Sequence, residues 1–424
     1  MTTFWKFARV LAASATTLCQ AAELPTADPA SLGLSAELLA RIKPVIQAEI
    51  DKGQYPGAVM LIARNGHIAY FDSAGQLDPS SGREMTKDAI FRLYSMTKPY
   101  TSVAIMMLME EGKLRISDPV SKFLPALANP VVSVERRDPQ TGMIKYVNVA
   151  ADREVTIQDL LRHTAGYVYP GFTAHQKVKE AYTKEKVDWK DLTAQEQVER
   201  LAKVPLANHP GTTFEYGMST DVLGRVVEAI SGLPRSEFLR QRIFEPLGMT
   251  DSAFIVPQDK LTRLAQPFAT DPVTKTPINL LDVTRPQLND AGGAGSVGTA
   301  SDYARFLQML LNGGELDGVR LLSPSTVRYM TADHLGPEMK SSGATTLPAG
   351  AGFGLGFAVR NDTGRFEVTG NAGEYYWAGA AGTGFYVDPK EQIICVWMTQ
   401  ASFGMPWRFD RYLFKQMVYQ AIER

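Results

Sequence analysis

The sequence has few cysteines and no excess of charge of either sign. Only Cys19 and Cys395 occur among 424 residues, and neither belongs to a C-x-x-C or other metal-spaced pair. Lysine and arginine together number 44, against 45 for aspartate and glutamate, which gives a net charge of −1. Because a nucleic-acid partner requires a basic surface, this balance argues against nucleic-acid binding. Cys395 lies in an apolar run, so we interpret it as a buried core residue.

Long apolar runs and metal-binding spacings are also missing. No stretch approaches the ~20 apolar residues of a membrane-spanning helix, so no stable membrane anchor is expected. Residues 1–22 resemble a weak secretory signal, with Lys6 and Arg9 ahead of a short apolar stretch. The protein would be periplasmic or secreted if these residues are a signal peptide, and otherwise cytoplasmic. The histidines show no H-E-x-x-H or comparable spacing, and we predict neither a metal nor another cofactor.

Strand patterns do occur, and they lie at both ends of the chain. Two apolar runs, 57–64 and 67–73, flank Asn65-Gly66, which is the strongest short-range signal for a hairpin. Helices are predicted over 36–52 and 408–422. The region between these flanks has a helical, loop-rich pattern without a comparable strand cluster. Further strands near the C-terminus are predicted over 366–369, 376–380, 382–387 and 393–399.

This distribution predicts an α+β fold, in which one antiparallel sheet made from both ends of the chain is flanked by terminal helices. A mainly helical domain is inserted between the two parts. We predict residues 23–115 and 290–424 for the α/β domain and residues 116–289 for the inserted domain. Thr156 and Thr299 each stand three residues before an aspartate, which marks two capped helix starts.

The motif Ser95-Met96-Thr97-Lys98 precedes an apolar helical run that ends at Gly112. If Ser95 opens this helix, Lys98 shares its face and can approach the hydroxyl. A serine hydroxyl needs a neighbouring base, and lysine can serve once burial or a second positive charge lowers its pKa. The N–H groups at a helix start also favour a developing oxyanion. Taken alone, the pattern is more typical of an ordinary surface helix start than of a catalytic site.

The same motif resembles the S-x-x-K element of class C β-lactamases, penicillin-binding proteins and family VIII carboxylesterases. The chain is identified as a member of this serine hydrolase superfamily by motifs that extend over roughly residues 30–420. The resemblance implies the β-lactamase/transpeptidase-like form of the α+β fold. The further stretches that carry it are 159–166, 210–216, 244–250 and 301–306.

Tyr216 matches the family's second element, Y-x-N, within Tyr216-Gly217-Met218. By this resemblance its phenol would relay protons between Ser95 and the leaving group. Met218 stands where β-lactamases carry asparagine, so the amide that helps to bind a lactam is absent. A packed tyrosine with a satisfied hydroxyl is the structural alternative.

The third element, K-T-G, is absent, and Trp377-Ala378-Gly379 stands in its place. This stretch resembles the W-x-G variant of family VIII esterases. The resemblance implies that Trp377, Gly379 and Ala380 bind substrate, with the backbone N–H of Ala380 joining that of Ser95 in an oxyanion hole. A tryptophan supplies an apolar wall instead of a cation, which favours a neutral, hydrophobic ester. A purely structural Trp377 is the alternative.

Two other candidate motifs fail. The stretch 294–298 departs from the G-x-S-x-G elbow because Ala294 replaces the first glycine, so Ser296 is expected in a glycine-rich turn. We interpret His163 as a structural residue at the end of a capped helix, because the superfamily works without a catalytic histidine.

The leading hypothesis is a carboxylesterase that forms an acyl-enzyme on Ser95 with short-to-medium-chain esters, while Lys98 and Tyr216 manage the proton. Weak β-lactam hydrolysis is a plausible side activity. The alternatives are a class C-like β-lactamase or D-alanyl-D-alanine carboxypeptidase, and a non-catalytic penicillin-binding-like protein. The expected partner is a small-molecule ester. The natural substrate, the stereochemical preference and the oligomeric state stay open.

Overall fold

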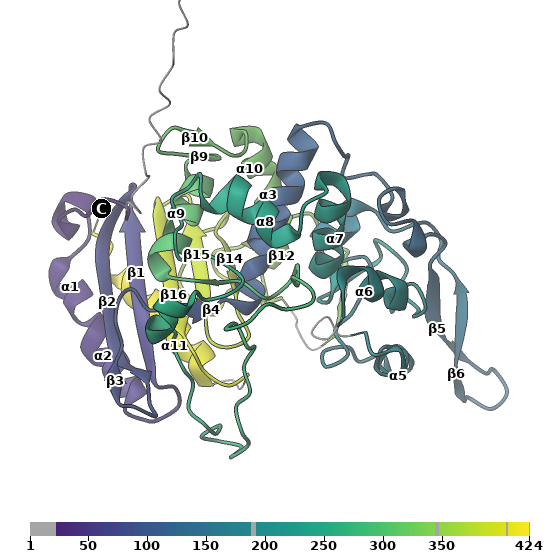
Figure 1. Cartoon of the computed structure of the whole chain (residues 1–424), viewed down its shortest axis with the longest axis horizontal. Coiled ribbons are helices and arrows are strands. Elements are labelled where there is room, and N and C mark those ends of the chain that lie inside the picture. Colours follow the sequence, from purple (N-terminus) through teal and green to yellow (C-terminus); the bar gives the residue numbers. More distant parts are fainter. Residues whose placement is uncertain (1–22, 188–191, 344–346, 404–405, 424) are drawn as a thin grey trace, which may run out of the picture.

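The computed structural model describes residues 23–187, 192–343, 347–403 and 406–423. Its main feature is an eight-stranded sheet with the strand order β12-β13-β14-β15-β16-β1-β2-β3. Both ends of the chain supply this sheet, because β1 pairs antiparallel with β2 on one side and with β16 on the other. Figure 1 shows these purple and yellow strands side by side. The predicted α+β fold class is confirmed.

The strands of the sheet are β1 (Gly57–Arg64), β2 (His67–Asp78), β3 (Arg83–Glu84), β12 (Ala351–Phe353), β13 (Ala358–Arg360), β14 (Tyr375–Ala378), β15 (Gly384–Asp388) and β16 (Ile393–Thr399). Four strand pairs lie outside it: β4 (Phe91–Arg92) with β8 (Val297–Gly298), β5 (Val131–Arg137) with β6 (Ile144–Ala150), β7 (Thr213–Glu215) with β11 (Lys340–Ser342), and β9 (Glu315–Leu316) with β10 (Val319–Arg320). The α-helices are α1 (Ala36–Ala40), α2 (Ile42–Ile50), α3 (Thr97–Glu110), α4 (Ile157–Leu161), α5 (Gln176–Glu185), α6 (Ala194–Leu201), α7 (Ser219–Ser231), α8 (Arg235–Leu239), α9 (Ala300–Leu311), α10 (Pro324–Met330) and α11 (Pro406–Gln420).

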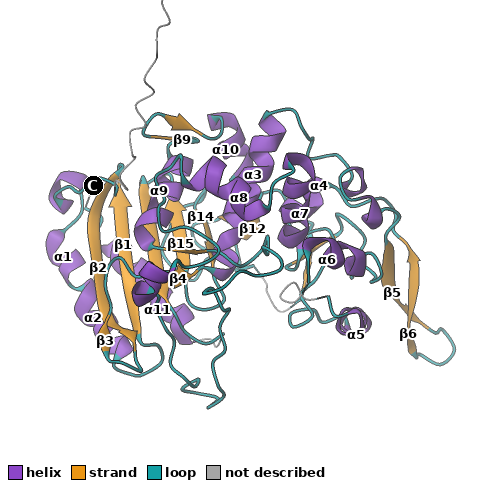
Figure 2. Cartoon of the chain, in the orientation of Figure 1, coloured by secondary structure: helices purple, strands orange, loops and turns teal. Residues whose placement is uncertain are grey.

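Helices cover both faces of the sheet. Leu61 of β1 packs in the core shared with α3 and α9, whereas its neighbour Met60 packs in the core shared with α2 and α11. Because side chains alternate along a strand, a strand buried on both faces requires a continuous apolar run. The run 57–64 meets that requirement, and every residue of β1 is buried. Figure 2 shows α1 and α2 beside one face and the larger group of helices beyond the other.

The predicted hairpin is confirmed. Asn65 and Gly66 have φ angles of 53° and 80°, which a two-residue turn with a right-handed strand twist requires. The predicted C-terminal strands correspond to β14, β15 and β16, and the last of these has the predicted bounds. The predicted helix over 36–52 is present as α1 and α2, interrupted at Arg41. The predicted C-terminal helix is α11.

Several smaller expectations have clear outcomes. Cys395 is buried, as predicted. Thr156 caps α4 in a capping box with Asp159, and Thr299 accepts a hydrogen bond from the N–H of Asp302 at the start of α9. The signal-peptide prediction for 1–22 lies outside the described residues.

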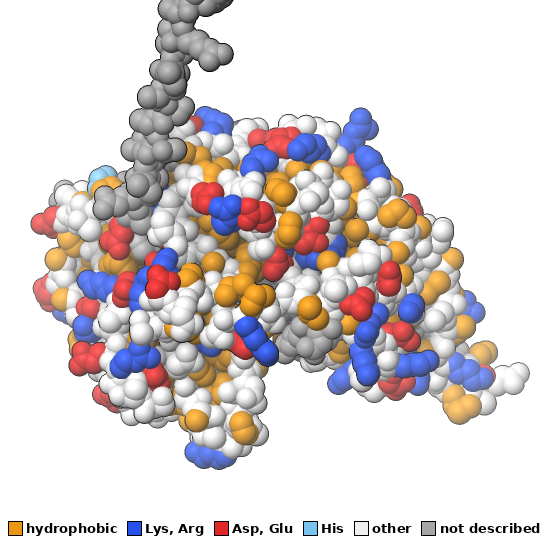
Figure 3. Space-filling model, in the orientation of Figure 1, with side chains coloured by type: hydrophobic (Ala, Val, Ile, Leu, Met, Phe, Trp, Pro, Cys, Tyr) orange, Lys and Arg blue, Asp and Glu red, His pale blue; other side chains and the backbone are white. Residues whose placement is uncertain are grey.

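No helix in the described ranges is long and apolar enough to cross a membrane. Figure 3 shows acidic and basic side chains interspersed over the face in view, without a large area of one sign.

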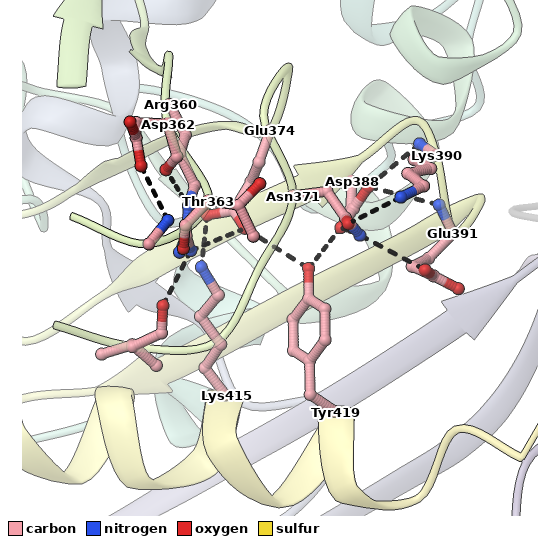
Figure 4. Close-up of polar contacts among 12 residues, drawn as sticks. Arg360, Asp362, Thr363, Asn371, Glu374, Asp388, Lys390, Glu391, Lys415 and Tyr419 are labelled. Atoms are coloured by element: carbon pink, nitrogen blue, oxygen red, sulfur yellow. Dashed lines mark hydrogen bonds and ion pairs between the residues drawn. The ribbon is translucent and has the colours of Figure 1, made fainter. Parts of the chain in front are cut away.

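The strand predicted over 366–369 is wrong. These residues form bends, and β13 lies earlier, at Ala358–Arg360. The reason is the guanidinium of Arg360, which donates hydrogen bonds to the carbonyls of Asp362, Thr363 and Val368. Those carbonyls are therefore unavailable to a neighbouring strand, and the segment wraps around one side chain (Figure 4).

The prediction that the middle of the chain lacks a comparable strand pattern is wrong for residues 131–150. They form the antiparallel pair β5–β6, which projects at one end of the molecule (Figure 1). Asp138 accepts hydrogen bonds from the N–H groups of Gln140 and Thr141 in the connecting turn. Val132 of β5 is buried in the main core, which joins this end of the ribbon to the rest of the molecule. The middle region supplies no described strand to the eight-stranded sheet, and the predicted domain boundaries stay a prediction.

Candidate active site

Ser95 lies at a sharp entry into α3. The chain leaves β4, passes through a short 3₁₀ turn over Tyr94–Met96 and continues directly into the helix. Tyr94 has a φ of 46°, a left-handed conformation that is uncommon for a residue with a side chain. Its hydroxyl accepts a hydrogen bond from the N–H of Leu281 at 2.8 Å, and Arg92 donates to the carbonyl of Leu281 at 2.6 Å. These contacts anchor the strained turn that presents Ser95.

Lys98 lies on the same face of the helix as Ser95, as the spacing predicts. Its Nζ is 3.3 Å from Ser95 Oγ, 3.3 Å from the hydroxyl of Tyr169 and 2.8 Å from the carbonyl oxygen of Gly293. The side chain is only 1% exposed. Three oxygen atoms therefore surround the nitrogen of a buried amine.

Tyr216 approaches Ser95 from a different part of the chain, directly after β7. Its hydroxyl donates a hydrogen bond to Ser95 Oγ at 2.7 Å, and Lys98 Nζ lies 4.7 Å from the centre of its ring. The structure thus brings together the three side chains that the motifs singled out.

His163 holds the segment that carries Tyr216. Its ring lies 4.8 Å from the ring of Tyr216, and its Nδ1 accepts a hydrogen bond from the N–H of Gly217 at 3.4 Å. Burial, and secondly the nearby charge of Lys98, hold the pKa of His163 well below its usual value. The imidazole is therefore neutral and able to accept this bond. A Cβ at position 217 would overlap the carbonyl of Tyr167, so this close approach requires glycine.

Trp377 and Gly379 lie beside the turn that carries Ser95. The ring centre of Trp377 is 5.2 Å from that of Tyr216. A Cβ on Gly379 would overlap the carbonyl oxygen of Leu93, so the end of β14 lies directly against the residues that precede Ser95. Thr383 strengthens this junction, because its hydroxyl donates to Leu93 O at 3.2 Å.

Two backbone N–H groups are free of protein acceptors at this junction. Neither the N–H of Ser95 nor that of Ala380 donates a hydrogen bond to another described residue. Buried backbone N–H groups normally have partners, so two free donors near one serine can receive an oxygen atom of a ligand. The roles of Trp377, Gly379 and Ala380 stay predictions.

The sequence did not point to Tyr169, Asp221 or Gly293, although all three belong to this cluster. Tyr169 lies 71 residues from Lys98 in the chain, beyond the reach of any helical or strand periodicity. Asp221 lies in the first turn of α7, within a run of buried residues. A charged residue in such a run is the one signal that marks it.

The serine of the incomplete elbow motif does not join the cluster. Ser296 is buried and its hydroxyl is 2.7 Å from that of Thr97. Within the part of the chain that the structure describes, no group of three or more His, Cys, Asp or Glu side chains could hold a metal ion.

Comparison with known proteins agrees with this geometry. Residues 42–416 match the family described as Beta-lactamase. The chain belongs to the beta-lactamase family. This membership confirms the β-lactamase/transpeptidase-like form of the fold.

Individual relatives of this beta-lactamase family member cover almost the same span. Protein Rv1367c of Mycobacterium tuberculosis is 34% identical over 84% of this chain and 88% of its own length. Esterase EstB of Burkholderia gladioli is 28% identical over 89% of this chain and 94% of its own length. The solved structure of EstCE1, described as a hydrolase with promiscuous acyltransferase activity, has a TM-score of 0.74 and 28% identity, covering 90% of this chain and 99% of that chain. The chain is a serine hydrolase of the β-lactamase-like type, and the relationship to family VIII carboxylesterases expected from its motifs is confirmed.

Proposed function

We propose that this chain hydrolyses short-to-medium-chain carboxylic esters through an acyl-enzyme on Ser95. One observation carries the proposal: Ser95 Oγ contacts both Lys98 Nζ, at 3.3 Å, and the Tyr216 hydroxyl, at 2.7 Å. A hydroxyl flanked by an amine and a phenol has both a base to take its proton and an acid to serve the leaving group. The similarity to EstB, an esterase, and to EstCE1, a hydrolase with acyltransferase activity, supports an ester substrate.

In the proposed reaction, Ser95 Oγ attacks the ester carbonyl carbon while its proton passes to the unprotonated amine of Lys98. The carbonyl oxygen becomes an oxyanion between the N–H groups of Ser95 and Ala380. Tyr216 then donates its proton to the departing alkoxide as the carbon–oxygen bond breaks, and Lys98 returns a proton to Tyr216. Water repeats the sequence on the acyl-enzyme, which releases the acid and restores Ser95.

The surroundings favour an ester over a lactam. Met218, which replaces the asparagine of β-lactamases, is 1% exposed and offers no amide to a substrate. Trp377, packed against Tyr216, contributes apolar surface where a lysine would contact a substrate carboxylate. The carboxylate of a lactam would therefore lack a cationic partner here, whereas a neutral ester needs none.

The test is a chain-length series of p-nitrophenyl esters with the wild type and Ser95→Ala. We expect saturable turnover that is fastest with short to medium acyl chains and is lost in Ser95→Ala. Ser102→Ala is the matched control, because Ser102 is a buried serine of the same helix whose hydroxyl has no described partner. Turnover by Ser95→Ala, or equal loss in both variants, would refute the proposal.

Nitrocefin measured beside p-nitrophenyl butyrate ranks the alternatives. We expect a much higher kcat/KM for the ester, with slow lactam turnover at most. A higher value for nitrocefin would favour the β-lactamase alternative. A fluorophosphonate probe that fails to label Ser95 would instead favour a non-catalytic protein.

A further inference from the structure

Lys98 is a buried lysine without a carboxylate in direct contact. Its Nζ contacts two hydroxyls and one carbonyl oxygen, and no ion pair joins it to a described carboxylate. When its amine takes the proton of Ser95, it becomes a buried charge, which is costly unless an opposite charge or well-oriented dipoles compensate it. The compensation must therefore come from the groups behind these oxygen atoms.

Asp221 stands behind two of the three. It is 1% exposed and lies in the first turn of α7. Its Oδ2 accepts a hydrogen bond from the Tyr169 hydroxyl at 2.9 Å, and its Oδ1 accepts one from the N–H of Gly293 at 3.2 Å. Tyr169 and Gly293 are the residues whose oxygen atoms receive the N–H groups of Lys98. One carboxylate thus orients two of the three hydrogen-bond partners of Lys98 Nζ.

Tyr169 transmits this charge as a fixed dipole. Burial, followed by the charge of Asp221, raises the pKa of Tyr169 well above its usual value. The phenol therefore keeps its proton, which points at Asp221, while its oxygen faces Lys98 at 3.3 Å. This polarity stabilises a positive charge on Nζ.

The cluster is closely packed around Gly293. A Cβ at this position would lie 2.7 Å from Asp221 Oδ2, 2.7 Å from the Tyr169 hydroxyl and 3.0 Å from Lys98 Nζ. All four residues therefore meet at one point, with no room for a side chain or a rearranged backbone.

Other charged groups surround the cluster. Tyr216 and His163 face Lys98 from β7 and from the end of α4. Arg225 and Arg235 are buried behind Asp221 and bind the carbonyls of Asp290 and Ala291. These two arginines pin the segment that leads into Gly293.

Each arginine also has a carboxylate within its own electrostatic surroundings. Arg225 pairs with Glu228 at 2.7 Å, and the backbone N–H of Ser236 donates to Asp290 Oδ2 at 3.2 Å. Asp221 also attracts both arginines, and it faces Lys98 through Tyr169 and Gly293.

We propose that Asp221, acting through Tyr169 and Gly293, is the buried counter-charge that positions Lys98 and stabilises its protonated form during turnover. Asp221 and Tyr169 are positioning residues: no bond to either forms or breaks when the Ser95 proton moves to Lys98. The arrangement resembles the general pattern in which a third group orients the base that activates a nucleophile. The inference rests on the proposed ester hydrolysis at Ser95.

The experiment measures kcat and KM of Asp221→Asn with p-nitrophenyl butyrate across pH. We expect kcat to fall roughly 10- to 100-fold with KM changed by less than about 3-fold. The reason is that the variant loses the orientation of the base but keeps the contacts that bind the substrate. The acid limb of the kcat/KM profile should move to lower pH, since removal of a nearby negative charge favours the neutral form of a base.

Asp290→Asn is the matched control. It removes the same charge nearby but leaves every contact of Lys98 intact, and we expect kcat within about 3-fold of wild type and an unmoved acid limb. A purely structural role of Asp221 would lower kcat without moving the limb, and that outcome, or unchanged kinetics, overturns the proposal.

If Asp221→Asn does not fold, Tyr169→Phe decides the matter. It removes only the bridging hydroxyl, so we expect a smaller fall in kcat with the limb moved in the same direction. Tyr182→Phe is its control, because the buried hydroxyl of Tyr182 has no described hydrogen-bond partner. An unmoved limb in Tyr169→Phe overturns the proposal. Failure of the proposed function is a separate result, seen as activity retained by Ser95→Ala.

Discussion

Two buried lysines lie on opposite sides of the sheet, and they differ in what surrounds them. Lys98, on α3, is 1% exposed and contacts only hydroxyl and carbonyl oxygen atoms. Lys415, on α11, is 4% exposed and forms a direct ion pair with Glu374. Figure 4 shows Lys415 rising from the helix toward that carboxylate.

The pair at Lys415 belongs to a network that joins α11 to the sheet. The Tyr419 hydroxyl donates its one proton to Asp388, and its oxygen also lies 3.3 Å from a carboxylate oxygen of Glu374. Burial raises the pKa of Glu374 and lowers that of Lys415, and in each case it outweighs the attraction between the partners. The pair is therefore costly to bury, and removal of one partner leaves the other charge uncompensated.

This difference shows that a buried lysine can have either of two roles. A carboxylate in direct contact holds an ammonium as a structural charge, as at Lys415. A carboxylate held one residue away, as Asp221 is from Lys98, orients the amine and leaves it in contact with Ser95. Variants at both lysines and at their neighbours test this difference.

Lys98→Met has the largest expected effect. We expect kcat/KM to fall by ~10³-fold or more, because Ser95 loses its base. Stability should change little, since Asp221 keeps the hydrogen bonds from Tyr169 and Gly293. Ester kinetics and urea unfolding measure the two quantities. If Lys98→Met lowers the free energy of unfolding as much as the loss of one partner from a buried ion pair does, the comparison is contradicted.

Lys415→Met reverses the pattern. It leaves Glu374 buried without its partner, and we expect a loss of about 3–5 kcal/mol in the free energy of unfolding. The kcat/KM of the folded protein should stay within about 3-fold of wild type. The double variant Glu374→Gln with Lys415→Met should recover part of the lost stability, because no charge is then left unpaired. A large loss of kcat/KM in folded Lys415→Met would show that the two lysines are not separable.

The pH dependence of the free energy of unfolding tests the surroundings of Lys98 through its neighbour His163. Its folded-state pKa lies well below its usual value because of burial and Lys98, so the unfolded chain binds the proton first. The contribution is present above pH ~6.5 and is lost as pH falls, by up to about 2 kcal/mol at pH 5. His163→Asn cannot titrate, and asparagine tolerates the φ of 55° at this position. Its unfolding free energy should therefore decline less than that of wild type between pH 7.5 and 5.0, and equal declines would count against this account.

Tyr419→Phe tests the Lys415 side with the smallest change. Loss of the hydrogen bond to the Asp388 carboxylate should lower the free energy of unfolding by about 1.5 kcal/mol and leave ester turnover unchanged. Tyr182→Phe, which removes a buried hydroxyl without a described partner, provides the baseline. Thermal or urea unfolding of both variants gives the comparison, and equal effects would mean that the Tyr419 hydrogen bond adds nothing.

The sequence by itself determined the features that depend on near neighbours. Asn65-Gly66 predicted the hairpin, because only a few residue types accept two successive positive φ angles. The spacing of Ser95 and Lys98 predicted their contact, because residues three apart share a helix face. Tyr216 was found by resemblance to a family, since no local rule connects it to Ser95.

Only the tertiary structure decided the rest. Arg360 binds the carbonyls of Asp362, Thr363 and Val368, so a side chain outside the predicted strand decides the path of this segment. Asp221 and Tyr169 reach Lys98 from distant segments, so no periodicity marks them. Local backbone preferences act over a few residues, whereas burial and hydrogen-bond pairing depend on contacts between remote segments. The surroundings of the Lys98 amine depend on such remote contacts.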